Sequence, residues 1–192
     1  MSDERPVFYY DLGSPYAYIT AERINSTLPV VPEWQPILLG GVFKATGRSS
    51  WGLGPDRAAG MAECERRAEA YGLMPFRWPA NWPGDYLVAM RAATFAKKSG
   101  RAVAFSLAAF RQQFAAGRDL SELDNVLLAA AACELHPRAV TTGIESKGVK
   151  DELRRATEEA IERGVVGVPT IRVRDELFWG DDRLGEVADA IG

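Results

Sequence analysis

A short apolar run that ends in a serine–proline turn constrains the fold of this chain more than any other feature. Residues 7–10 are apolar and strand-prone, and residues 11–13 then lead into Ser14, Pro15 and Tyr16. Serine is a favoured N-cap, and proline suits the first helical position because the N–H group that it lacks would have no partner there. The segment therefore predicts a strand, a tight turn and a helix that begins at Pro15.

The Ser14 hydroxyl can be interpreted in two ways. It stands at the N-terminus of the predicted helix, where backbone donors and the helix dipole favour an anion such as a thiolate or a carboxylate. An ordinary helix cap accounts for the same residue without any ligand. The serine–proline turn alone leaves this choice open.

A second motif lies near the other end of the chain. Residues 167–170 have the sequence Gly-Val-Pro-Thr and lead into an alternating, strand-like run at 171–173. A hairpin partner follows at 177–179, and residues 180–183, Gly-Asp-Asp-Arg, then open a helix that carries Leu184, Val187 and Ile191 on one face. This end of the chain therefore predicts a hairpin followed by a helix.

The two motifs together resemble a known family. The strings YYDLGSPYAYI and GVPT…FWGDDRL are similar to those of the 2-hydroxychromene-2-carboxylate isomerases. These enzymes are glutathione-dependent members of the thioredoxin superfamily, close to kappa-class glutathione transferases and DsbA-like proteins. The resemblance covers nearly the whole chain. It implies an α/β, thioredoxin-like fold with a large all-helical insertion, in one DsbA-like domain over residues 1–192.

The segments between the motifs have the order that this fold requires. A second strand is expected over 30–39, at a sheet edge because Pro32 and Pro36 limit its hydrogen bonding. A long loop is expected over 40–57, and a helix over 57–71. Residues 85–136 lack proline, and Gly100 and Gly117 divide them into about three helices. A further helix covers 149–163. The thioredoxin-like part is thus placed at about 1–57 and 165–192, and the insertion at about 58–164.

Composition limits the possible partners and the location. The chain has 192 residues, 47% of them hydrophobic, and a net charge of −3, without a basic stripe of the kind that binds nucleic acid. No apolar stretch approaches the roughly 20 residues that span a bilayer. The polar residues 1–5 do not resemble a signal peptide. We therefore expect a cytoplasmic protein with neither nucleic-acid nor membrane partners.

The cysteines and the single histidine exclude several kinds of catalysis. Cys64 and Cys133 are far apart, lack a C-x-x-C spacing and are expected to be buried apolar residues. Disulfide oxidoreductases on this fold carry a cysteine where Ser14 stands, so no dithiol oxidase activity is expected. His136, which precedes a proline, is interpreted as structural. With no second histidine, we expect neither a Ser-His or Cys-His pair nor a metal site.

The resemblance assigns Ser14 the central role, that of holding the sulfur of a bound thiol, with Pro15 and Tyr16 beside it. The Val168–Pro169 bond is implied to be cis, which leaves the Val168 backbone free to pair with the peptide part of the thiol. A single proline at a strand start is also common without any ligand.

Charged residues are implied at both ends of the thiol. Asp181 and Asp182 lie in the segment that binds the amino group of the γ-glutamyl moiety, although helix capping alone explains one of them. Arg48 and Arg57 stand where the kappa-class pattern carries an asparagine and a lysine. Arginine can bind a carboxylate through two hydrogen bonds, but it is not equivalent to lysine. A solvated surface role for Arg57 stays open. Residues 58–61 also depart from the more polar, tyrosine-bearing stretch of the isomerases.

Aromatic residues on the predicted loops suit a flat substrate. In the family arrangement they face the mouth of the thiol site, and Asn81 offers a polar anchor. The same residues are often core fillers or loop anchors. The aromatic residues concerned are Phe43, Trp51, Trp78 and Trp82.

The combined prediction is a cis–trans isomerase that uses glutathione or a related thiol and acts on an aromatic or conjugated pyruvate-like substrate through transient thiolate addition. One alternative is a kappa-like glutathione transferase or peroxidase, in which the activated sulfur is consumed. Another is a non-catalytic thioredoxin-like binding module. The family resemblance also implies a homodimer.

Overall fold

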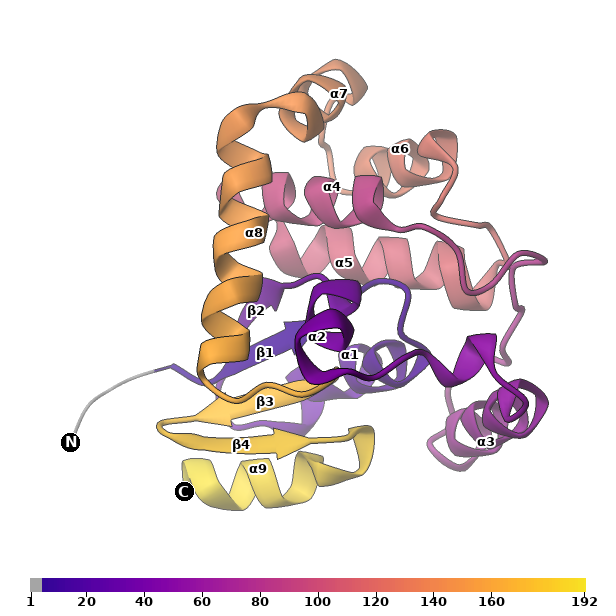
Figure 1. The fold of residues 1–192 in the computed structure, drawn as a ribbon, viewed down its shortest axis with the longest axis vertical. Helices are drawn as coiled ribbons and strands as arrows, with labels where there is room; N and C mark the ends of the chain where they lie inside the picture. The colour runs from indigo at the N-terminus through magenta and orange to yellow at the C-terminus, as the bar shows by residue number, and fades with distance from the viewer. Residues whose placement is uncertain (1–4) are drawn as a thin grey trace.

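A four-stranded mixed sheet joins the two ends of the chain in the computed structural model, which describes residues 5–192 (Figure 1). The strand order is β2-β1-β3-β4, with β1 parallel to β2 and antiparallel to β3. Phe8 of β1 is paired with Trp34 of β2 and with Ile171 of β3. The strands are β1 (Val7–Tyr10), β2 (Glu33–Pro36), β3 (Thr170–Val173) and β4 (Glu176–Trp179).

The first helix forms where the serine–proline turn predicts it. Helix α1 (Pro15–Thr27) has Ser14 as its N-cap and Pro15 at its first position, and Leu28 caps its other end. Its buried residues include Ala17, Ala21 and Ile24, a spacing that places them on one face. That face belongs to the main hydrophobic core. At the end of the chain, α9 (Leu184–Ile191) packs beside α1 and β3.

Helices fill the segment between β2 and β3, and the three helices expected over 85–136 are confirmed. Alanines on α4 are fully buried, which lets neighbouring helices approach closely. Phe95 packs onto Gly143, where a Cβ would lie 2.3 Å from its ring. The helices are α3 (Arg57–Ala70), α4 (Leu87–Lys98), α5 (Ala102–Phe110), which continues into the π-helix η2 (Arg111–Ala115), α6 (Leu123–Ala132), α7 (Pro137–Glu145) and α8 (Lys147–Glu162).

Three expectations about element bounds need correction. Residues 40–57 are not one loop, because they contain most of α2 (Leu39–Thr46) and the short helix η1 (Trp51–Leu53). The N–H groups of Leu38 and Leu39 bond to Thr157 and Asp11, so remote side chains replace the local cap that a sequence pattern would reveal. Strand β2 is shorter than 30–39, although it does lie at the edge. Helix α7, capped by His136, was not predicted.

Three further expectations concern the cysteines, membrane-spanning segments and a signal peptide. Both cysteines are buried and free, as predicted. No helix within residues 5–192 combines the length and apolar character needed to cross a bilayer. The expectation that no signal peptide is present falls largely on residues 1–4, which lie outside the described residues.

Candidate active site

A cavity of about 650 Å³ opens at the N-terminus of α1. Segments from both ends of the sequence line it: the serine–proline turn, the loop before β3 and the turn after β4. The segment over residues 39–56, Arg67 of α3 and Trp82 complete its wall. The volume lies within the range of about 300–1,000 Å³ that is usual for small-molecule sites.

Ser14 combines a capping role with an open donor. Its Oγ accepts a hydrogen bond from the Ala17 N–H at 3.2 Å, and the residue lines the cavity while being only 5% exposed. No hydrogen bond donated by the hydroxyl forms among residues 5–192. Because a hydroxyl accepts and donates independently, the cap leaves the Ser14 proton available to a group in the cavity.

Asp11 fixes the turn that presents Ser14. Its two carboxylate oxygens accept hydrogen bonds from the Gly13 N–H at 2.8 Å and from the Leu39 N–H at 2.9 Å. The carboxylate thereby ties the serine–proline turn to the start of α2. Burial raises the pKa of Asp11, while the two backbone hydrogen bonds oppose that rise. Sequence analysis missed this residue, although its place directly after a buried strand was a visible signal.

The Val168–Pro169 peptide bond is cis, as predicted, and it lines the same cavity as Ser14. The two ends of the sequence therefore meet at one cavity. Within residues 5–192, the Val168 N–H and C=O have no hydrogen-bond partner, whereas the carbonyl of Pro169 accepts from Gly180. The Val168 backbone is thus an open pairing edge on the wall of the cavity. A second cis bond, Trp82–Pro83, was not predicted.

The two adjacent aspartates occupy different environments. Asp181 is 2% exposed, and its Oδ1 lies 2.6 Å from Nη1 of Arg67. Burial raises the pKa of Asp181, and the Arg67 guanidinium opposes that rise. Asp182 lines the cavity and is exposed. The sequence did not distinguish these two acids, but in the structure only Asp182 offers a solvent-exposed carboxylate.

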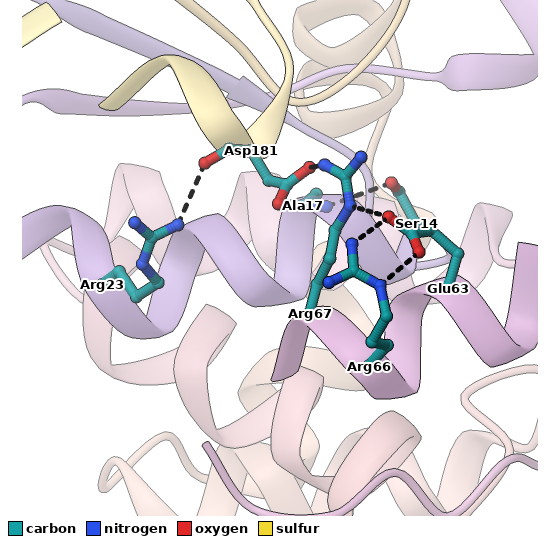
Figure 2. A network of polar contacts seen from close by, with 7 residues as sticks. All are labelled: Ser14, Ala17, Arg23, Glu63, Arg66, Arg67 and Asp181. Carbon is teal, nitrogen blue, oxygen red and sulfur yellow. Dashed lines mark hydrogen bonds and ion pairs between the residues drawn. The ribbon is translucent and has the colours of Figure 1, made fainter. Parts of the chain in front are cut away.

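A polar network surrounds Asp181 (Figure 2). Arg67 also donates from Nε to Glu63 at 2.7 Å, and Arg66 on the same helix contacts Glu63 as well. From α1, Arg23 donates to the backbone carbonyl of Asp181 at 3.0 Å. The network joins α1, α3 and the short helix η3 (Asp181–Arg183) behind one wall of the cavity. Arg67 lines that wall, and sequence analysis missed it because nothing in the pattern separates it from Arg66.

The two predicted arginines separate in the structure. Arg48 lines the cavity and is held by the Val166 carbonyl at 2.8 Å and by the ring of Trp179, 4.7 Å from its guanidinium carbon. Arg57 does not line the cavity. Its Nη2 donates to the Trp82 carbonyl at 2.8 Å, so it anchors the loop that carries Trp82.

The predicted aromatic residues also divide into two groups. Trp51, Trp82 and Phe43 line the cavity, and the rings of Trp51 and Trp82 lie 5.0 Å apart. Trp78 lies outside it, in ring contact with Trp82 and Phe76. Asn81 is exposed on the same loop and does not line the cavity either.

Gly60 explains the unusual start of α3. A Cβ at this position would lie 2.4 Å from the ring of Trp51, so the missing side chain lets the indole lie flat on the helix. Trp51 therefore packs directly on α3 at residues 58–61.

A second chamber of about 320 Å³ adjoins the cavity and shares Gly13, Leu39, Phe43 and Ser50 with it. Its wall is largely apolar and includes Met90. Polar groups at the chamber come from Asp11 and Tyr86, and burial raises the pKa of Tyr86 to about 12. The two spaces together offer a polar compartment beside a more apolar one.

Cys64 lies close to this site but is not equipped to react. Burial is the main cause that raises the pKa of its thiol to about 12, so the thiol stays protonated at neutral pH. Thiolate is the nucleophilic form of cysteine. Among residues 5–192, the candidate site therefore contains no activated cysteine, and thiolate chemistry there would require a thiol from outside those residues.

Comparisons with known proteins agree with this geometry. A family model for the DSBA-like thioredoxin domain matches residues 7–192. A 2-hydroxychromene-2-carboxylate isomerase from Sphingobium xenophagum is 30% identical over 184 residues, with 92% of each chain covered. One from Pseudomonas putida is 26% identical and covers 96% of this chain and 93% of its own length.

A solved structure of a 2-hydroxychromene-2-carboxylate isomerase has a TM-score of 0.84 at 24% identity, over 97% of this chain and 94% of that one. That likeness establishes the fold, and the predicted α/β thioredoxin-like architecture with a helical insertion is confirmed.

Proposed function

This chain belongs to the DSBA-like thioredoxin domain family, and from that premise we propose that it is a glutathione-dependent isomerase of the 2-hydroxychromene-2-carboxylate type. The proposal covers a cis–trans isomerisation of an aromatic or conjugated pyruvate-like substrate. Its relatives at 30% and 26% identity carry the name of that isomerase. The observation that supports it most is the open donor of Ser14 beside the open backbone of Val168 in one cavity.

The residues around the cavity fit a thiol-bearing peptide. The Val168 N–H and C=O would pair with the peptide groups, as one strand edge pairs with another. Asp182 would take the ammonium group of the γ-glutamyl moiety, and Arg48 a carboxylate at the other end. When bound, a thiol supplies a sulfur nucleophile whose reversible addition to a conjugated double bond permits rotation about that bond.

Ser14 would favour the charged form of the sulfur. The hydroxyl donates its free proton toward the position of the thiolate, and the N-terminus of α1 adds positive potential. Hydrogen bonding to a charged form and nearby positive potential both lower the pKa of an acid. Because Asp11 fixes the turn, little reorganisation of the protein would be needed to aim the Ser14 hydroxyl at the sulfur during the reaction. Ser14 itself forms no covalent bond in this scheme.

The aromatic part of the substrate would lie against Trp51, Trp82 and Phe43. Phe43 lines both the cavity and the second chamber, and the two tryptophans line the cavity, so an aromatic ring would lie beside the sulfur position. Trp82 is held in place, since its Nε1 donates to the Gly13 carbonyl at 3.0 Å. A rigid aromatic wall suits a flat substrate that must present one double bond to the sulfur.

A turnover experiment tests the proposal. The protein is incubated with a conjugated aryl pyruvate and glutathione, and both isomers and free thiol are followed over time. We expect isomers to equilibrate while the glutathione concentration stays constant. Accumulation of a glutathione conjugate would instead establish the transferase alternative, and the absence of glutathione binding by calorimetry would establish a binding module of another kind. The implied homodimer and cytoplasmic location remain predictions, the first of which sedimentation can test.

A further inference from the structure

Arg67 has hydrogen-bonding capacity that its partners in the protein do not use. An arginine side chain carries five N–H donors. In this structure Nε donates to Glu63 and Nη1 donates to Asp181. Within residues 5–192, the Nη2 group has no hydrogen-bond partner. The side chain is 26% exposed and lines the cavity, so these remaining donors lie where a ligand can reach them.

The polar network around Arg67 carries no net negative charge. It contains two carboxylates, on Glu63 and Asp181, and three guanidinium groups, on Arg23, Arg66 and Arg67 (Figure 2). An anion that approaches Arg67 from the cavity therefore meets open donors that this network does not oppose. The fixed partners on both sides also hold the guanidinium plane in one direction, which reduces the entropy lost when a ligand binds.

We propose that Arg67 binds the α-carboxylate of an α-amino-acid group at the end of the bound thiol, while the neighbouring Asp182 binds the α-ammonium group. This inference rests on the proposed function and identifies the residues that select which thiols the protein binds. Asp182 is the exposed acid of the pair and also lines the cavity. A guanidinium and a carboxylate that line the same cavity match the two charges of a zwitterion, and Asp181 serves to position Arg67.

Two glutathione analogues separate these contacts. 4-Aminobutanoyl-cysteinylglycine lacks only the α-carboxylate, and glutaryl-cysteinylglycine lacks only the α-ammonium group. Calorimetric titration with glutathione and with each analogue should show that the unmodified protein binds glutathione about ten-fold more tightly than either.

The variants test which residue binds the α-carboxylate and which binds the α-ammonium group. Arg67→Met combined with Asp181→Asn avoids a buried unpaired carboxylate, and Asp181→Asn alone is its reference. The double variant should bind glutathione and the aminobutanoyl analogue equally well, and it should still discriminate against the glutaryl analogue. Arg66→Met is the matched control: it removes a neighbouring arginine that also contacts Glu63 but does not line the cavity, and it should bind all three ligands as the unmodified protein does.

Each other outcome overturns a defined part of the account. Suppose that the double variant keeps the ten-fold preference for glutathione over the aminobutanoyl analogue, or loses affinity for all three ligands equally. In either case Arg67 is only a structural support, and the inference is wrong while the proposed function stands. If the unmodified protein binds no glutathione at all, the proposed function fails, and the inference fails with it.

Discussion

The cavity has two walls that are built in different ways. The sheet-side wall, formed by Ser14, Val168 and Asp182, places its polar groups through turns of the backbone at the ends of strands and helices. The α3-side wall, formed by Trp51, Arg67 and Trp82, consists of long side chains: the two indoles are in ring contact, and ion pairs hold Arg67. Backbone geometry leaves the first wall little freedom, whereas the second depends on several mutually supporting contacts.

This difference assigns the two walls different tasks. In the proposed function the sheet-side wall holds the sulfur, the peptide groups and the α-ammonium group of the thiol. The α3-side wall contacts the aromatic substrate and, through Arg67, the α-carboxylate of the thiol. The ion pair between Arg67 and Asp181 at 2.6 Å links the two walls.

Breaking this link should produce the largest effect on stability. Asp181→Ala leaves the partly buried Arg67 without its partner, and it should lower the free energy of unfolding by about 2–3 kcal/mol. Asp182→Ala removes an exposed side chain, so stability should change by no more than about 0.5 kcal/mol, while affinity for glutathione falls about ten-fold. Urea unfolding and calorimetry measure both quantities. If Asp182→Ala lowered stability and Asp181→Ala lowered only the affinity for glutathione, the roles of the two acids would be reversed.

A methyl group added to α3 should disturb one wall only. Gly60→Ala places a Cβ 2.4 Å from the ring of Trp51, so the indole must move. The KM for an aromatic substrate should rise about ten-fold, without a change in the pKa of the bound thiol. Gly148→Ala, on α8, meets no atom within 4 Å and should leave KM unchanged while it stabilises the helix by up to about 1 kcal/mol. A shifted thiol pKa in Gly60→Ala would mean that the walls are not independent.

The cysteines should have the smallest effect on function. Cys64→Ala and Cys133→Ala should retain thiol-dependent turnover, because neither sulfur is activated. A pH effect on stability is expected instead. Cys64 in the unfolded chain ionises near its ordinary pKa of 9.0, whereas in the folded protein burial raises that pKa to about 12. Its contribution to stability is therefore complete below pH 9 and is lost as the pH rises toward 12. Chemical unfolding at pH 8 and pH 10 should show a weaker pH dependence for Cys64→Ala.

The sheet-side wall could be predicted from the sequence because its signals are local. Ser14 followed by Pro15 specifies a capped helix start, and the family resemblance supplied the cis bond at Pro169. The three helices over 85–136 followed from the lack of proline and from Gly100 and Gly117, whereas α7 was not predicted. Helix α2 could not be predicted, since its first N–H groups are satisfied by side chains that are remote in the sequence.

The α3-side wall could be predicted only in part: the family resemblance placed Trp51 and Trp82 at the site, but Arg67 depends on tertiary contacts. Arg66 and Arg67 are adjacent and chemically identical, and only the rotation of α3 decides which one faces the cavity. Trp78 and Trp82 lie on one loop, yet only Trp82 lines the cavity. Asp181 and Asp182 likewise differ only through the turn after β4. Local patterns carry no information about these choices.

The pKa of glutathione bound to the protein tests the central claim most directly, since thiolate formation can be followed by ultraviolet absorbance across a pH series. In the unmodified protein this pKa should lie below the ordinary thiol value of about 8.5. In Ser14→Ala it should be higher by about one to two units, because a charge-assisted hydrogen bond is lost, while loss of the helix cap lowers stability by only about 1 kcal/mol. Identical titration curves in the two proteins would contradict the account and leave Ser14 as a helix cap alone.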